Sequence, residues 1–185
     1  MAIGASGASR ARAGTRGAVY VEFLIAFLPV LIMFMCLWQM SRLYTTGLAV
    51  EHAAITAARS GSVVFADDPA QYGGAELHKP MGQRRQTVEG AALMPLSPFI
   101  LDGSLVSVNV TFPSSPGSSQ ERDHYDPSDP NSDDAHKVDF VRVHIEATFR
   151  CRIPLADRIA CNPLTRTRTI IREAAYPYQG AGYVY

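Results

Sequence analysis

The chain has 185 residues, enough for one modest domain and an anchor but not for two full domains. Its 17 basic residues balance its 17 acidic ones, so no overall charge attracts it to nucleic acid, and we expect no nucleic-acid partner. The charges are unevenly spread, because Arg10, Arg12 and Arg16 precede Gly17 without any acidic residue.

The first segment, residues 1–17, is small, polar and basic, and it shows no apolar periodicity. This composition predicts a basic leader or a disordered cytoplasmic tail. The next segment, residues 18–61, is expected to form one long helix.

The first half of that helix is predicted to cross a membrane. Residues 23–41 are nineteen residues without a formal charge, and at 1.5 Å per residue they extend about 28 Å, close to the thickness of a bilayer core. We place the transmembrane part at about residues 19–41. The alternatives are the core helix of a soluble protein and a cleaved secretory signal. The apolar region of a signal is shorter, about 7–15 residues, and a small-residue cleavage site follows it, which is missing here.

The arginines upstream of the span place the N-terminus in the cytoplasm, because positive charges stay on that side. Residues 62–185 are then expected in the periplasm or outside the cell. Beyond the span the helix carries apolar or small residues roughly on one face, which we expect to pack on the domain. These residues are Leu43, Leu48, Val50, Ala54, Ile55 and Ala58.

The sequence of residues 62–185 predicts a small α+β domain. Residues 81–93 have the pattern of a short amphipathic helix. Residues 104–112 and 137–151 alternate apolar and polar side chains, which predicts strands, and residues 167–178 form a third strand or a short helix. The fold class is therefore a long N-terminal helix followed by an antiparallel sheet of three or four strands.

An acidic loop, residues 113–137, separates the first two strands. It is rich in Pro, Ser, Gly and Asp, which predicts a long exposed loop without a core. Asp129, Asn131 and Asp133 match the opening of a calcium loop. However, Asp134 replaces the expected glycine, and Phe140 occupies the position of the final glutamate. A solvated acidic face explains this loop best, and a looser calcium site is the alternative.

Two cysteines near the end of the second strand, Cys151 and Cys161, are separated by nine residues. Outside the cytoplasm this pair is expected to form a disulfide. Two reduced cysteines are the alternative if the topology is inverted. The chain shows no spacing typical of a catalytic, cofactor or metal site, so we expect a protein that is not an enzyme.

One pattern at the start of the helix resembles a known family. Gly17, four small or apolar residues, Glu22 and a long apolar helix resemble type IV pilin-like precursors, which a membrane prepilin peptidase cuts after the glycine. More narrowly, RGAVYVEFLIAFLPVLIMF and a helix ending in ITAARSG resemble the TadE-like family of the tight-adherence (Flp, type IVc) pilus system. The resemblance covers about residues 15–61.

The resemblance implies a role for each of three residues. Gly17 would precede the cut, Ala18 would become the new N-terminus, and Glu22 would be the fifth residue of the mature chain. In pilin-like assemblies such a glutamate meets the N-terminal ammonium of an adjacent subunit. Glu22 also has a simpler explanation, because at the cytoplasmic end of the span it can reach the headgroup region.

The resemblance further implies a non-catalytic minor pilin or pseudopilin of the bacterial inner membrane, which could enter an extracellular pilus. Its partners would be prepilin peptidase and other pilin-like subunits. Two rival functions are an unprocessed single-span scaffold of a pilus or secretion machine, and a membrane-anchored module that binds calcium or another ligand.

Overall fold

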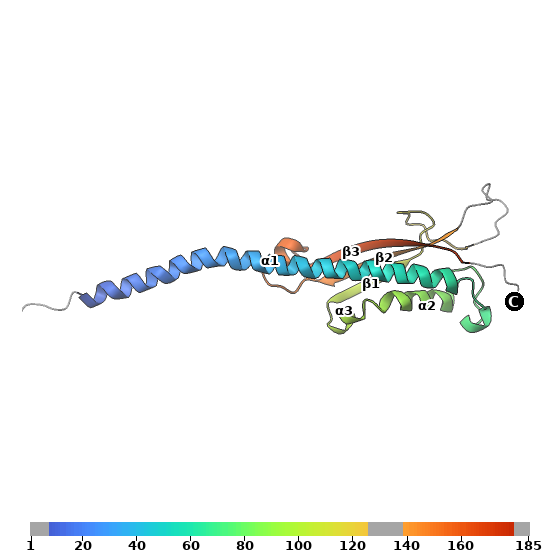
Figure 1. The fold of residues 1–185 in the computed structure, drawn as a ribbon, viewed down its shortest axis with the longest axis horizontal. Helices are drawn as coiled ribbons and strands as arrows, with labels where there is room; N and C mark the ends of the chain where they lie inside the picture. Colours follow the sequence, from blue (N-terminus) through green and yellow to red (C-terminus); the bar gives the residue numbers. More distant parts are fainter. Residues whose placement is uncertain (1–7, 126–138, 180–185) are drawn as a thin grey trace, which may run out of the picture.

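The computed structural model describes residues 8–125 and 139–179. One long helix, α1 (Ala8–Val64), packs against the other elements with its C-terminal half, and its N-terminal half projects away from them (Figure 1). The other elements are η1 (Pro69–Tyr72), α2 (Gly82–Leu93), α3 (Ser97–Leu101), β1 (Leu105–Thr111), β2 (Phe140–Arg150), α4 (Asp157–Ala160) and β3 (Thr167–Pro177).

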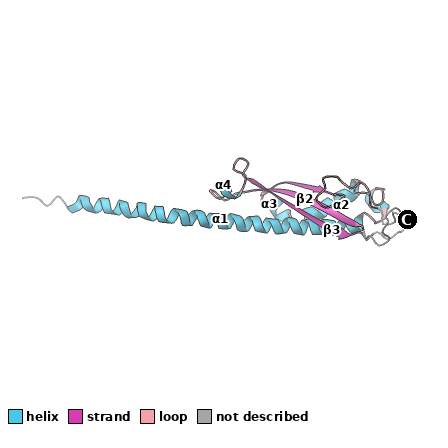
Figure 2. Cartoon of the chain, turned by 90° about the horizontal axis from the view of Figure 1, so that it is seen from above, coloured by secondary structure: helices cyan, strands magenta, loops and turns pink. Residues whose placement is uncertain are grey.

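The sheet is antiparallel with the order β1-β2-β3, so β2 is the central strand. Figure 2 shows it lying across the C-terminal half of α1. The alternation predicted for β2 is present, because its apolar side chains are buried while the intervening ones are not. The buried set is Val141, Val143, Ile145, Ala147 and Phe149. The predicted combination of a long apolar helix with an antiparallel sheet is confirmed, and residues 167–178 supply a strand rather than a helix.

The buried face of α1 is made of small side chains, which allows α2, β2 and β3 to approach it closely. Its buried members between positions 50 and 58 are Val50, Ala53, Ala54, Ala57 and Ala58. The prediction was wrong for Leu48 and Ile55, which are 50% and 45% exposed. Both lie on the far side of the helix, because steps of two or five residues from Val50 turn about 140–160° away from it.

The ends of α1 differ from the prediction. The helix begins at Ala8 rather than at residue 18, and alanines and arginines there extend an existing helix without a new nucleation step. Gly61 does not stop it. A Cβ at Gly61 would lie 3.0 Å from Val141 Cγ1 and 3.2 Å from Phe65 Cε2. This glycine therefore permits close packing of α1 on the sheet, and the helix continues to Val64.

Part of the acidic loop is not exposed as predicted. Tyr125 is completely buried and stacks on Phe65, with ring centroids 5.4 Å apart, and on Tyr178, at 5.9 Å. Arg122 holds this part of the loop in place by donating to both carboxylate oxygens of Asp139, at 2.7 and 2.6 Å. The candidate calcium residues Asp129, Asn131, Asp133 and Asp134 lie outside the described residues.

Candidate functional site

The projecting half of α1 presents an apolar surface that the described residues of the domain leave uncovered. An 18-residue window within Val19–Val64 is apolar enough to cross a membrane, and none of that window is buried. This segment is therefore not the core helix of the domain. Its exposed large side chains are Val19, Tyr20, Val21, Phe23, Leu24, Ile25, Phe27, Leu28, Val30, Met33, Phe34, Leu37 and Trp38. Isolated apolar residues are common on protein surfaces, but a continuous surface of this length marks a site of contact with membrane or protein.

Glu22 lies at the start of this surface and is itself exposed. Among the residues whose side chains the structure describes, namely residues 17, 19–125 and 139–179, none forms an ion pair or a hydrogen bond with the Glu22 carboxylate. Together with Gly17, Val21, Ile25 and Ala26 it borders a shallow depression on one side of the helix. The structure thus brings the predicted residues Gly17 and Glu22 to one small surface.

The backbone around the predicted cut is helical. Gly17 is exposed, and a Cβ built on it would meet nothing within 4 Å. Ala18 follows it inside α1, so the Gly17–Ala18 bond lies within a continuous helix. A neighbouring molecule could approach the helix closely at Gly17.

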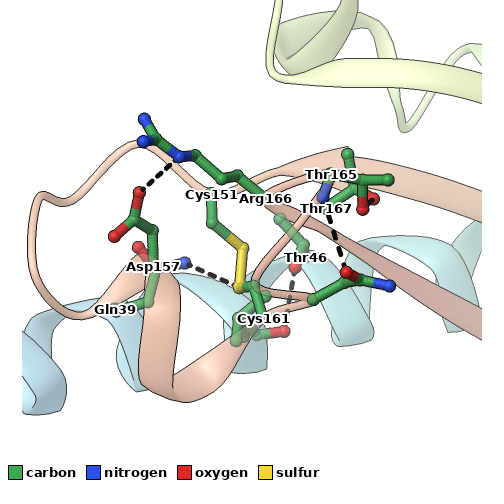
Figure 3. Close-up of a disulfide and its surroundings, with 10 residues drawn as sticks. Gln39, Thr46, Cys151, Asp157, Cys161, Thr165, Arg166 and Thr167 are labelled. Atoms are coloured by element: carbon green, nitrogen blue, oxygen red, sulfur yellow. Dashed lines mark hydrogen bonds and ion pairs between the residues drawn. A yellow bond between two sulfur atoms is a disulfide. The ribbon is translucent and has the colours of Figure 1, made fainter.

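The domain begins to cover α1 at Gln39, the first residue along α1 that is described as buried, with 3% of its surface exposed. Its Nε2 lies 3.9 Å from Cys161 Sγ (Figure 3). In the described part of the chain its Oε1 has no hydrogen-bond partner. Sequence reasoning missed this contact, although a glutamine within an apolar run was a signal.

The two predicted cysteines meet beside this glutamine. Cys151 follows β2 and Cys161 follows α4, and their Cα atoms are 6.6 Å apart with the sulfur atoms at disulfide distance (Figure 3). Two further contacts join this region to Arg166, the residue directly before β3. The Cys151 amide donates to the Arg166 carbonyl at 2.8 Å, and Asp157 pairs with Arg166 at 3.4 Å.

We expect removal of this cross-link to lower the stability of the domain. The double variant Cys151→Ser/Cys161→Ser should lose about 2–3 kcal/mol in free energy of unfolding, because the short loop is no longer closed in the unfolded chain. Urea unfolding of the full chain in detergent measures this change. Cys36→Ser is the control, since Cys36 is unpaired on α1. Free thiols at both positions of the purified wild-type chain would contradict the cross-link.

Among the described residues, no group of three or more His, Cys, Asp or Glu side chains could hold a metal ion. The strongest polar features of the site are instead the single carboxylate of Glu22 and the disulfide loop next to α1.

The fold and this surface define a class: a small α+β domain on an apolar helix that projects beyond it and is long enough to cross a membrane. Comparisons with protein-family models, with curated proteins and with solved structures find no match.

Proposed function

We propose that this chain is a non-catalytic, pilin-like component of a tight-adherence pilus system, related to the TadE-like family and anchored in the inner membrane by α1. The observation that carries the proposal is the projecting half of α1, which is apolar, uncovered and interrupted near its start by Glu22, for which the described residues provide no partner. Such a helix can insert into a bilayer before assembly and contact the helices of other subunits after assembly.

Glu22 supports assembly as the function. An ionised carboxylate in the bilayer core is unfavourable by roughly 2.5–3.5 kcal/mol on insertion scales, so an intramembrane charge calls for a partner. The described part of this chain supplies none. The ammonium of a processed Ala18 in an adjacent subunit has the opposite charge, and the two charges would compensate each other in the low-dielectric interior.

Two independent features support a domain outside the cytoplasm. Arg10, Arg12 and Arg16 precede the apolar segment, and positive charges flanking a span stay in the cytoplasm. At the other end, Cys151 and Cys161 lie at disulfide distance, and disulfides persist in oxidising compartments such as the periplasm. Both features point to the same orientation.

Co-expression with a prepilin peptidase tests the proposal. We expect the chain to lose residues 1–17, so that its intact mass begins at Ala18. A Gly17→Leu variant is the matched control and should stay uncut, because a large side chain then occupies the position before the scissile bond. A mass that still includes Ala2 in the wild-type chain would contradict processing and support the unprocessed scaffold.

One observation favours that scaffold as a second candidate. The Gly17–Ala18 bond lies inside α1, which begins ten residues earlier, at Ala8. Cleavage therefore requires α1 to open locally around this bond. Gly14 and Gly17 make this opening easier, since each weakens a helix by about 1 kcal/mol relative to alanine. In the scaffold the helix would stay closed and Glu22 would remain near the headgroups.

A further inference from the structure

Three segments meet at the end of the domain that faces the projecting half of α1. They are the start of the covered part of α1, the turn after α3, and the loop of residues 151–166, which contains α4. Cys161 of the loop lies against Gln39, and Asp102 after α3 pairs with Arg42 at 3.4 Å. Figure 2 shows α4 at this end of the domain. We call this end the proximal face.

The loop of residues 151–166 carries aliphatic side chains that point into open space. Leu164 is 92% exposed, Ile159 70% and Leu155 52%. Leu101, at the end of α3 on the same face, is 87% exposed. Large aliphatic side chains grouped at one end of a domain are the feature by which a surface enters the interfacial layer of a membrane.

Arginines surround these aliphatic side chains. Four lie in the three segments of the proximal face, namely Arg42, Arg152, Arg158 and Arg166, and Arg150 and Arg168 lie at the adjoining ends of β2 and β3. The acids of the three segments are Asp102 and Asp157. Both acids are already paired, with Arg42 and Arg166, each at 3.4 Å. Among the described residues, no acidic side chain forms an ion pair with the other four arginines. Arg150, Arg152 and Arg166 also line one depression beside the disulfide.

The position of Gln39 in α1 indicates where the proximal face lies along the membrane normal. Gln39 lies two residues before the end of the uncharged run 23–41, which corresponds to about 3 Å along the helix axis. If that run spans the hydrocarbon, the disulfide loop lies at its outer boundary. There, aliphatic side chains can enter the headgroup layer, and guanidinium groups match phosphate with paired hydrogen bonds.

We infer that the loop of residues 151–166 is a second membrane contact, in which Leu155, Ile159 and Leu164 enter the outer interface and the surrounding arginines bind phosphates of anionic phospholipids. The inference rests on the membrane span of the proposed function and is independent of processing at Gly17. Five of these six arginines lie far from the span in the sequence and do not bear on its orientation, because only charges within about 15–20 residues of a span and in short loops decide it. Arg42 directly follows the span and is outnumbered by Arg10, Arg12 and Arg16 before it.

Tryptophan quenching by brominated phospholipids tests this contact in the full chain. Trp38 is the only tryptophan, so in the wild-type chain it reports insertion of the span. The test variant is Leu164→Trp in a Trp38→Phe background. Its control is Met81→Trp in the same background, because Met81 is 63% exposed and precedes α2 at the other end of the domain. Both exposed sites tolerate the substitution without disturbing the core.

In vesicles of brominated phosphatidylcholine mixed with phosphatidylglycerol, we expect at least about twofold stronger quenching for Leu164→Trp than for Met81→Trp. Removing the phosphatidylglycerol, or adding Arg158→Gln and Arg168→Gln, should reduce the quenching, whereas Arg59→Gln with Lys79→Gln should not. If Leu164→Trp is quenched no more strongly than Met81→Trp, while Trp38 of the wild type is quenched, the loop contact is overturned and the span stands. Absence of Trp38 quenching would overturn the span itself, and the loop contact with it.

Discussion

Replacing Arg84 by methionine should destabilise the domain by about 3–5 kcal/mol, because three carbonyl groups would lose their hydrogen-bond donor. Arg84 lies on α2 and is completely buried. Its guanidinium donates to the carbonyl of Val64, the last residue of α1, to the Asp67 carbonyl at 2.8 Å and to the Ala75 carbonyl at 3.3 Å. It also lies over the Tyr72 ring, 4.7 Å from the centroid.

Arg84 thus satisfies the free carbonyl at the C-terminal end of α1 and the turn that follows. A cation at this position also interacts favourably with the negative end of the helix dipole. In the Met variant the side chain keeps much of its volume, but the three carbonyl groups lose their donor. The turn of residues 65–75 should loosen, and α2 should lose its anchor on α1.

The neighbouring Arg85→Met variant is the matched control. Arg85 is about a third exposed and pairs with Glu89 at 2.8 Å and with Glu121 at 3.1 Å. Arg85 also donates to the Val110 carbonyl at 3.1 Å. Its ion pairs are partly exposed and screened by water, so we expect a loss of about 1–2 kcal/mol, smaller than for Arg84→Met. Urea unfolding of both full-length variants in detergent, followed by circular dichroism, compares them. Similar losses for the two variants would contradict the structural role of Arg84.

Local patterns in the sequence were sufficient for most of the fold. Strict alternation in β2 fixed which side chains face the core, and the position of α2 followed from helical periodicity. The errors arose where distant segments meet. Gly61 looks like a helix stop in isolation, but it is a packing contact with Val141. Tyr125 belongs to a segment of loop composition, yet its ring fills a space next to Phe65.

The candidate site likewise contains residues that could be predicted from the sequence and contacts that could not. Gly17 and Glu22 could be found from sequence because they are close in the chain and because a charge in an apolar run is conspicuous. A glutamine within an apolar run signals that Gln39 needs a polar contact, but no local pattern identifies Cys161, 122 positions away, as its partner. The proximal face was missed for this reason: its arginines and aliphatic side chains come from several segments that are distant in the sequence, and each segment alone looks like an ordinary surface.

Glu22→Ala should leave membrane insertion intact and abolish assembly. Loss of the carboxylate makes insertion easier, by roughly 2.5–3.5 kcal/mol at most. In the assembled state, however, the ammonium of the adjacent subunit would be buried without a partner. Breaking a buried ion pair in this way costs about 3–5 kcal/mol, which weakens association by more than about a hundredfold. Glu22→Asp keeps the charge and should retain part of the function.

The control for this substitution is Glu51→Ala on the same helix. Glu51 is exposed, lies beyond the predicted span and pairs only distantly with Arg172, at 4.0 Å. Loss of a carboxylate there removes no intramembrane charge. We therefore expect wild-type levels of both membrane insertion and assembly for this variant.

The most direct measurement is the amount of pilus sheared from cells that carry each variant, normalised to the amount of this chain in the membrane fraction. We expect Glu22→Ala to reach the membrane at wild-type levels and to yield no pilus, whereas Glu51→Ala yields as much as the wild type. A normal yield of pilus from Glu22→Ala would contradict assembly through this carboxylate.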